Sequence, residues 1–295
     1  MKRLIVNADD FGFTRGVNAG IAHAYKMGIL TSATIMANGD AFEDAVEVAR
    51  ANSGLGLGCH LSAVGGRPVA PARDVASLVD GDGMLPATLT RLMIKLARGQ
   101  VRSGDIESEF RAQVGRVVGA GIRPTHLDSH KHSHTHPQVM RALARVAREF
   151  GIRSVRNPFE SLLASPRAGA TARARRAAYL KQCAMSAAIS VRAISFKRLA
   201  REYGLRTPDY FFGMRLTGLL DGEALRGLIK STRHGTTELM CHPAVYDQEL
   251  ERAGTRLKRE RERELEALTD PALRRLIEEE GVDLISYREL GQRHA

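Results

Sequence analysis

Residues 3–12 read RLIVNADDFG, an apolar run that ends in two adjacent carboxylates. Residues 3–8 are predicted to form a strand, and their nearly continuous apolar character is typical of a strand buried on both faces. Asp9 and Asp10 repel each other and lose solvation at the end of such a strand, so a metal ion or a hydrogen-bonding partner would have to compensate them. A helix N-cap with Asp in its first turn is the alternative interpretation.

Similar apolar runs alternate with helical patterns along the 295-residue chain. Strands are predicted at residues 3–8, 31–37, 55–59, 124–128, 209–214, 236–241 and 282–286, and helices at 18–27, 42–51, 106–118, 137–149 and 248–268. This alternation predicts an α/β fold with a parallel sheet covered by helices. Open doubly wound sheets and closed barrels both fit. No GxGxxG follows the first strand, which disfavours a dinucleotide-binding domain.

A basic segment interrupts the α/β pattern. The chain has 44 Lys and Arg against 33 Asp and Glu, a net charge of +11, and residues 161–201 contain basic residues but no acidic one. We expect a single catalytic domain, 1–295, with an insertion at 161–205. The insertion is either a solvated helical hairpin at the pocket rim or, through residues 184–196, an interfacial helix attracted to anionic lipid.

Composition narrows the class of protein. Three cysteines lie far apart without a CxxC pair, no long apolar leader precedes residue 10, and no apolar run is long enough to span a bilayer. We therefore expect a soluble cytoplasmic protein. Its possible membrane contact is peripheral, at the inner membrane face, through residues 165–200. Aromatic residues make up only 5% and no nucleic-acid reader motif is found, which disfavours specific nucleic-acid binding.

Histidines gather after the later predicted strands. GCHL covers residues 58–61, THLDSHKHSHTH covers 125–136 and ELMCHP covers 238–243. Five of the ten histidines fall within residues 126–136, and this density predicts metal binding. His60 alone is more typical of a core or loop histidine, and His242 alone is ambiguous. Because the C-terminal ends of parallel strands meet at one face, these clusters are expected to meet Asp9 and Asp10 there.

One carboxylate with two imidazoles is the three-ligand set that leaves coordination positions open for water and substrate. Mixed nitrogen and oxygen donors suit zinc or another first-row divalent ion better than magnesium. A carboxylate left over from the Asp9–Asp10 pair could act as a general base, and His242 could act as a general acid.

The ordered motifs NADDFG, GCHL, THLDSHKHSH and ELMCHP resemble the YdjC-type carbohydrate deacetylases, including their ChbG-like and hopanoid-associated HpnK-like branches. VNAGI, GILTSAT, residues 156–160 and LISYREL extend the resemblance over nearly the whole chain. It implies a distorted (β/α) barrel of about seven parallel strands, similar to that of the polysaccharide deacetylases. It also implies a homodimer and hydrolysis of the N-acetyl group of an amino sugar, either a chitooligosaccharide or an N-acetylglucosaminyl glycolipid of the hopanoid type, with release of acetate.

The resemblance also implies roles for individual residues. Asp10, His60 and His130 would hold one divalent metal ion, zinc or magnesium. Asp9 would be the general base, His242 the general acid, and Arg156 would orient Asp9. Substrate binding is expected of His132, His134, Asn38 and Glu160. Cys59 and the basic insertion depart from the family pattern. Because of the insertion, the resemblance does not identify the substrate.

The main alternative is a metallophosphoesterase or amidohydrolase-like hydrolase with a two-metal centre. In that hypothesis, the segment from Asp128 to His132 would supply an HxH-type pair of ligands, His130 and His132, for the two-metal centre.

Overall fold

The computed structural model describes residues 1–160 and 173–292. Its strands are β1 (Lys2–Phe11), β2 (Ser32–Ile35), β3 (Gly56–Leu61), β4 (Leu127–Ser129), β5 (Tyr210–Phe212), β6 (Gly235–Cys241) and β7 (Val282–Leu284). Its helices are α1 (Arg15–Met27), α2 (Phe42–Ala51), α3 (Leu89–Ala97), α4 (Ser103–Gly119), α5 (Pro137–Glu149), α6 (Arg173–Ser190), α7 (Ala193–Glu202), α8 (Gly222–Ser231), α9 (Gln248–Arg252), α10 (Arg259–Leu268), α11 (Ala272–Glu279) and α12 (Tyr287–Gln292). Short 3₁₀ segments are found at Ala72–Val75 and His130–Thr135.

The strands form one parallel sheet in the order β4-β3-β2-β1-β6-β5, and β7 pairs with the beginning of β1. Single parallel bridges continue the sheet beyond β4, first from Leu127 to Val155 and then from Ser154 to Arg206, which precedes β5. The segment around Ser154 therefore lies between the two outer strands, and the sheet curls into a distorted barrel. The predicted parallel α/β barrel of about seven strands is confirmed.

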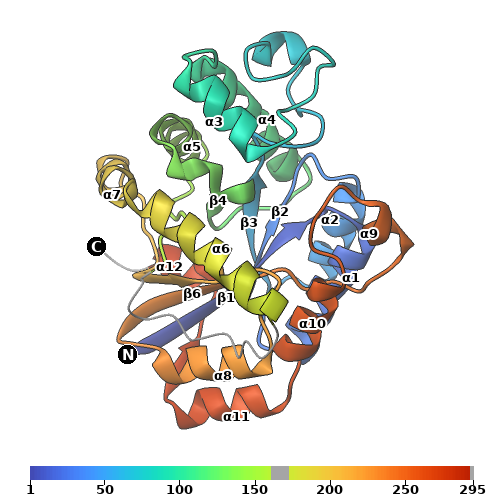
Figure 1. Ribbon diagram of the computed structural model, residues 1–295, viewed down its shortest axis with the longest axis vertical. Coiled ribbons are helices and arrows are strands. Elements are labelled where there is room, and N and C mark those ends of the chain that lie inside the picture. Colours follow the sequence, from blue (N-terminus) through green and yellow to red (C-terminus); the bar gives the residue numbers. More distant parts are fainter. Residues whose placement is uncertain (161–172, 293–295) are drawn as a thin grey trace.

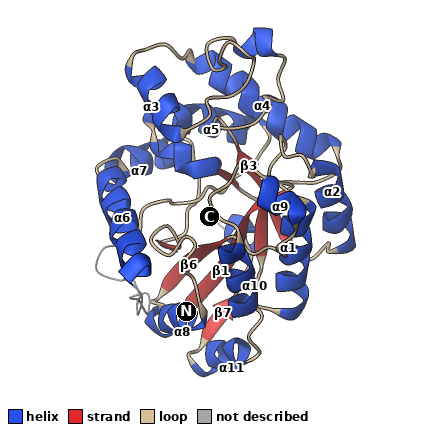
Figure 2. Ribbon diagram, turned by 45° about the vertical axis from the view of Figure 1, so that its right-hand side comes forward, coloured by secondary structure: helices blue, strands red, loops and turns tan. Residues whose placement is uncertain are grey.

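Helices surround the sheet (Figures 1 and 2). Helices α4, α5 and α7 pack in sequence on one side, and α2, α1, α10, α8 and α11 form a second series. The apolar core runs through both series, and β1 at its centre has almost no exposed side chain after Arg3. Polar groups at the C-terminal ends of the strands are consequently held in a largely dry environment.

Several boundaries follow directly from local sequence signals. Helices α2 and α5 have the predicted bounds, and α5 begins with Pro137 at its first turn, a position that proline favours. The predicted helix over residues 248–268 is wrong. The chain becomes extended at Ala253, and Lys258 Nζ donates to the carbonyls of Leu250, Glu251 and Ala253, so two helices, α9 and α10, replace the single one.

The basic insertion is helical where it is described, in α6 and α7. Residues 161–172 of the predicted insertion lie outside the described residues. Among the residues described, no helix has both the length and the apolar composition that crossing a membrane requires.

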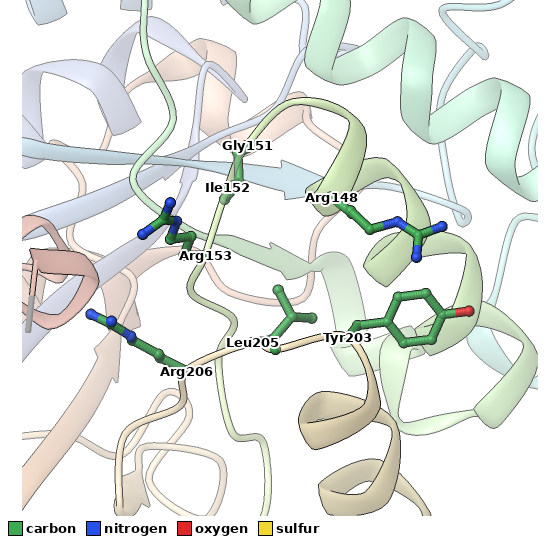
Figure 3. A pocket seen from close by; sticks show the side chains of 8 residues that line it. Arg148, Gly151, Ile152, Arg153, Tyr203, Leu205 and Arg206 are labelled. Atoms are coloured by element: carbon green, nitrogen blue, oxygen red, sulfur yellow. The ribbon is translucent and has the colours of Figure 1, made fainter. Parts of the chain in front are cut away.

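A cavity of about 400 Å³ lies between the C-terminal ends of α5 and α7. Figure 3 shows Arg148 and Tyr203 at one end of it and Arg153 and Arg206 at the other. Arg148 lies in the last turn of α5, where its positive charge offsets the negative end of the helix dipole. None of the predicted site residues lines this cavity.

Candidate metal centre and active site

The two carboxylates at the end of β1 are presented by an irregularity in the strand. The pairing register of β1 with β2 shifts between Ala8 and Phe11, and Asp10 has a left-handed backbone with φ of 66°. In a regular strand, consecutive side chains point to opposite faces. The bulge re-aims them, so that both Asp9 and Asp10 are buried and both contact polar groups of the site. Such strain in a residue other than glycine is typical of functional positions.

Three of the predicted ligands meet in a nearly equilateral triangle. Asp10 Oδ1 lies 3.3 Å from His130 Nδ1 and 3.5 Å from His60 Nε2, and the two ring nitrogens are 3.4 Å apart. His60 is on β3, His130 directly follows β4, and Asp10 is on β1. The C-terminal ends of three strands thus converge as the sequence predicted.

Asp128 orients His60. The two residues are register partners in β3 and β4, and Asp128 Oδ1 lies 2.7 Å from His60 Nδ1. Thr34 Oγ1 is 3.2 Å from the other carboxylate oxygen of Asp128. Because Nδ1 is hydrogen-bonded to Asp128, Nε2 is the ring nitrogen of His60 that faces the triangle. A carboxylate behind a ligating histidine is the usual arrangement at metal sites.

Arg156 joins three buried carboxylates. Its Nη1 and Nη2 donate to Asp9 at 2.7 and 2.6 Å, Nη1 is also 2.6 Å from Asp128 Oδ2, and Nε donates to Glu238 at 2.8 Å. The guanidinium is fully buried. Tyr287 donates its hydroxyl proton to the other oxygen of Glu238 at 2.5 Å. A fork-shaped donor with this many acceptors fixes the orientation of Asp9 strictly.

His242 follows β6 on the other side of β1 and is 8% exposed. Its backbone N–H donates to Glu264 Oε2 at 2.6 Å, and its Nδ1 lies 3.8 Å from the same oxygen. Among the described residues, Nδ1 has no hydrogen-bond partner. The ring is held at the site but keeps an unused nitrogen.

Burial and charge oppose each other in the pKa values of the site. Burial raises the pKa of Asp9 and of Asp10. The positive charges of Arg156, beside Asp9, and of Arg261, beside Asp10, contribute to a net lowering of both pKa values, so both carboxylates stay ionised. Burial lowers the pKa of His60, yet the carboxylates of Asp128, Asp9 and Asp10 raise it to about 9.

For two other carboxylates and for His242, burial has a larger effect on the pKa than the neighbouring charges do. It raises the pKa of Glu238 and of Glu264 to about 7, and it lowers that of His242 to about 4.

The donor set fits a divalent cation. Ligands about 2.0–2.1 Å from a tetrahedral zinc ion are about 3.3–3.4 Å apart, which matches the triangle.

The four residues expected to bind substrate differ in their burial and in their contacts. His134 is fully buried, with Nδ1 2.6 Å from Ser129 Oγ and Nε2 3.3 Å from the Arg156 carbonyl. His132 has a left-handed backbone, and its ring contacts Phe211 edge-on at 5.7 Å.

Asn38 donates to the carbonyls of Gly65 and Arg67, in the loop that follows β3. Glu160 accepts the backbone N–H of Arg215 at 3.0 Å. Substrate binding by these four residues stays a prediction.

Sequence reasoning did not assign four residues that the structure places at the site. Asp128 was noted only within the histidine-rich segment, and Glu238 only within ELMCHP, although an acidic residue inside an apolar strand is itself a signal. Arg261 and Glu264 belong to RERERELEAL, where their charge suggests exposure, although both share a helix face with Leu268. Only the packing of α10 against the barrel brings them inside.

The chain is similar to known proteins over nearly its whole length. The family model described as YdjC-like protein matches residues 3–279. A carbohydrate deacetylase from Geobacillus stearothermophilus is 36% identical over 286 residues, covering 97% of this chain and 96% of the relative. One from Brevibacillus brevis is 32% identical, covering 98% of this chain and all of the relative.

A crystal structure from Enterococcus faecalis V583, described as a proposed cellobiose-phosphate cleavage protein, shares the fold. Its TM-score is 0.79 at 27% identity, and the match covers 98% of each chain.

Proposed function

The chain belongs to the YdjC-like protein family and is a hydrolytic carbohydrate deacetylase, and we propose that it uses one divalent ion to remove the N-acetyl group of an amino sugar, releasing acetate. The observation that supports metal dependence is the triangle of Asp10 Oδ1, His60 Nε2 and His130 Nδ1. Its mixed nitrogen and oxygen donors suit zinc better than magnesium, which prefers oxygen ligands.

When bound, the ion would polarise the acetamide carbonyl and lower the pKa of a water molecule. Asp9 accepts the proton of the attacking water, and Arg156 holds this carboxylate ionised and in one orientation. General bases of this kind contribute about 10²–10⁴-fold to the rate.

His242 donates a proton to the departing amine. In the free protein its pKa of about 4 leaves the ring neutral at pH 7, so the donating form is reached only with the reaction partners in place. Glu264 lies 3.8 Å from Nδ1 and is placed to stabilise the protonated ring.

A two-metal hydrolase is disfavoured. A second candidate ligand group consists of Asp9, His60 and Asp128, but Arg156 already pairs with both of its carboxylates at 2.6–2.7 Å. The guanidinium takes the charge-compensating role that a second ion would have.

The test is acetate release from N-acetylglucosamine, chitobiose and an N-acetylglucosaminyl lipid, before and after chelation and with zinc or magnesium restored. We expect release to fall with chelation and to return with zinc. His130→Ala should abolish the return, and His23→Ala, at an exposed position of α1, should not. Unchanged release after chelation would reject metal dependence, and release of phosphate in its place would favour the two-metal alternative.

A lipid-linked substrate is the more specific version of the proposal, with the α6–α7 surface contacting an anionic membrane. Leu180, Met185, Val191 and Ile194 are 51–84% exposed along this surface. The described cations beside them, Arg176, Lys181, Lys197 and Arg198, are exposed, and no acidic residue occurs from 173 to 201. Two copies of so basic a face would repel each other, whereas anionic lipid would attract it.

Co-sedimentation with phosphatidylserine vesicles tests this contact. Changing both Leu180 and Ile194 to Ser should weaken binding, and Val118→Ser, an exposed apolar residue on α4, should not. Equal sedimentation of all three proteins would reject it. Homodimer formation and a cytoplasmic location stay predictions.

A further inference from the structure

Helix α10 inserts a buried arginine behind one of the candidate metal ligands. Arg261 is 1% exposed, and its Nη2 donates to Asp10 Oδ2 at 2.6 Å. Its Nε donates to the Leu257 carbonyl at 3.3 Å, within one turn of the chain, which fixes the plane of the guanidinium.

The two oxygens of Asp10 are thereby divided between two neighbours. Oδ2 is taken by Arg261, and Oδ1 faces His130 at 3.3 Å and His60 at 3.5 Å. Asp10 has a left-handed backbone with φ of 66°, and its side chain contacts Arg261 through one oxygen and the two histidines through the other.

Arg261 also reaches the other side of the site through its backbone. Its carbonyl accepts the N–H of Ala244 at 3.3 Å, two residues after His242. One turn later, Glu264 accepts the backbone N–H of His242 at 2.6 Å. A single helix therefore sets the position of the candidate ligand Asp10 relative to the candidate acid His242.

We propose that Arg261 is a positioning residue of the metal centre: by holding Asp10 Oδ2 it presents Oδ1 alone to the ion and so raises the affinity of the centre for a divalent cation. The inference rests on the metal centre of the proposed function and adds to it a residue that contacts no reacting atom. Contacts of this kind behind a metal ligand are worth about 10–100-fold in metal affinity.

A purely electrostatic role of Arg261 predicts the opposite change in metal affinity. A guanidinium beside a divalent cation repels it, so if charge alone mattered, removing Arg261 would tighten metal binding. If orientation of Asp10 matters more, removing it weakens metal binding. The direction of the change therefore distinguishes the two explanations.

The experiment is a titration of the metal-free full chain with zinc alone, in competition with a chromophoric chelator. We expect Arg261→Met to weaken zinc binding about 10–100-fold. Arg261→Lys keeps the charge but loses the planar fork, so it should recover only part of the affinity. Arg263→Met, on the exposed face of the same helix, is the matched control and should bind as the wild type does.

A second readout uses Co²⁺, whose visible absorption is strong when its coordination is tetrahedral. This band should weaken in Arg261→Met and remain in Arg263→Met. Wild-type or tighter zinc affinity in Arg261→Met would overturn the inference. If that variant does not fold, Arg261→Lys decides, because undiminished affinity in it would have the same consequence. A wild-type chain that binds no zinc would instead overturn the proposed metal centre itself.

Discussion

Arg156 donates two hydrogen bonds to Asp9, at 2.7 and 2.6 Å, from a position with no solvent exposure. This pair fixes the candidate general base in one orientation and keeps it ionised. The next residue, Asp10, contributes its carboxylate to the metal triangle instead. The adjacent carboxylates of the NADDFG motif thus have separate partners and, in the proposed mechanism, separate tasks.

Asp9→Asn should reduce acetate release by about 10²–10⁴-fold while the protein still binds zinc, because the amide cannot accept a proton. Acetate release and zinc content measured on the same preparation check this. Loss of zinc in parallel with activity would mean that Asp9 acts as a ligand and not as a base.

Arg156→Met should destabilise the fold by about 3–5 kcal/mol, because it leaves buried carboxylates without a counter-charge. Urea unfolding of the metal-free protein measures the loss. Arg226→Met is a suitable control: its pair with Asp270 is solvent-exposed, and removing it should cost about 0–1 kcal/mol. Similar costs for the two variants would show that Arg156 is not the central counter-charge.

His242 should make the fold sensitive to acid. Burial lowers its pKa from 6.5 to about 4, whereas the unfolded chain takes up the proton near 6.5. Its contribution to stability is therefore complete above pH 6.5 and is lost as the pH falls through 4. In the metal-free protein, His242→Gln should lose up to about 3 kcal/mol less stability than the wild type over this window.

The measurement for His242 is urea unfolding at several pH values between 7 and 4. His23→Gln, at an exposed position, should follow the wild-type profile. A profile of His242→Gln that coincides with the wild type would contradict a neutral buried ring.

Gly20→Ala should impair catalysis although Gly20 is not one of the candidate site residues. Gly20 lies on α1, and a Cβ there would come within 2.4 Å of the Ala244 backbone, displacing the loop that follows His242. We expect lower kcat and lower stability. Gly115→Ala on α4 meets nothing within 4 Å and should stabilise the protein by about 0.5–1 kcal/mol, since alanine favours helix interiors. Equal kcat in both variants would show that the loop tolerates displacement.

Much of the site was predictable because parallel strands place their C-terminal ends together. Asp10, His60 and His130 each follow or end an apolar run, so a common face could be inferred without coordinates. The bounds of α2 and α5 were equally accessible, since their apolar spacing and the Pro137 start signal are local.

The bulge was not predictable, because the predicted strand ends at residue 8 and the register shift that follows it depends on pairing with β2. The break after α9 depends on Lys258 reaching back to three carbonyls, which the charged sequence does not reveal.

The sequence by itself determined the alternation of strands and helices, the family, and the residue types available for an ion. Periodicity and order along the chain are enough for these, because they depend on neighbours in sequence. Only the tertiary structure decided which charges are buried and with whom: Arg156 among three carboxylates, and Arg261 and Glu264 turned inward from a helix that looks fully solvated. Buried pairs join segments far apart in the sequence, such as Asp10 and Arg261, which are 251 residues apart, and no local pattern encodes that contact.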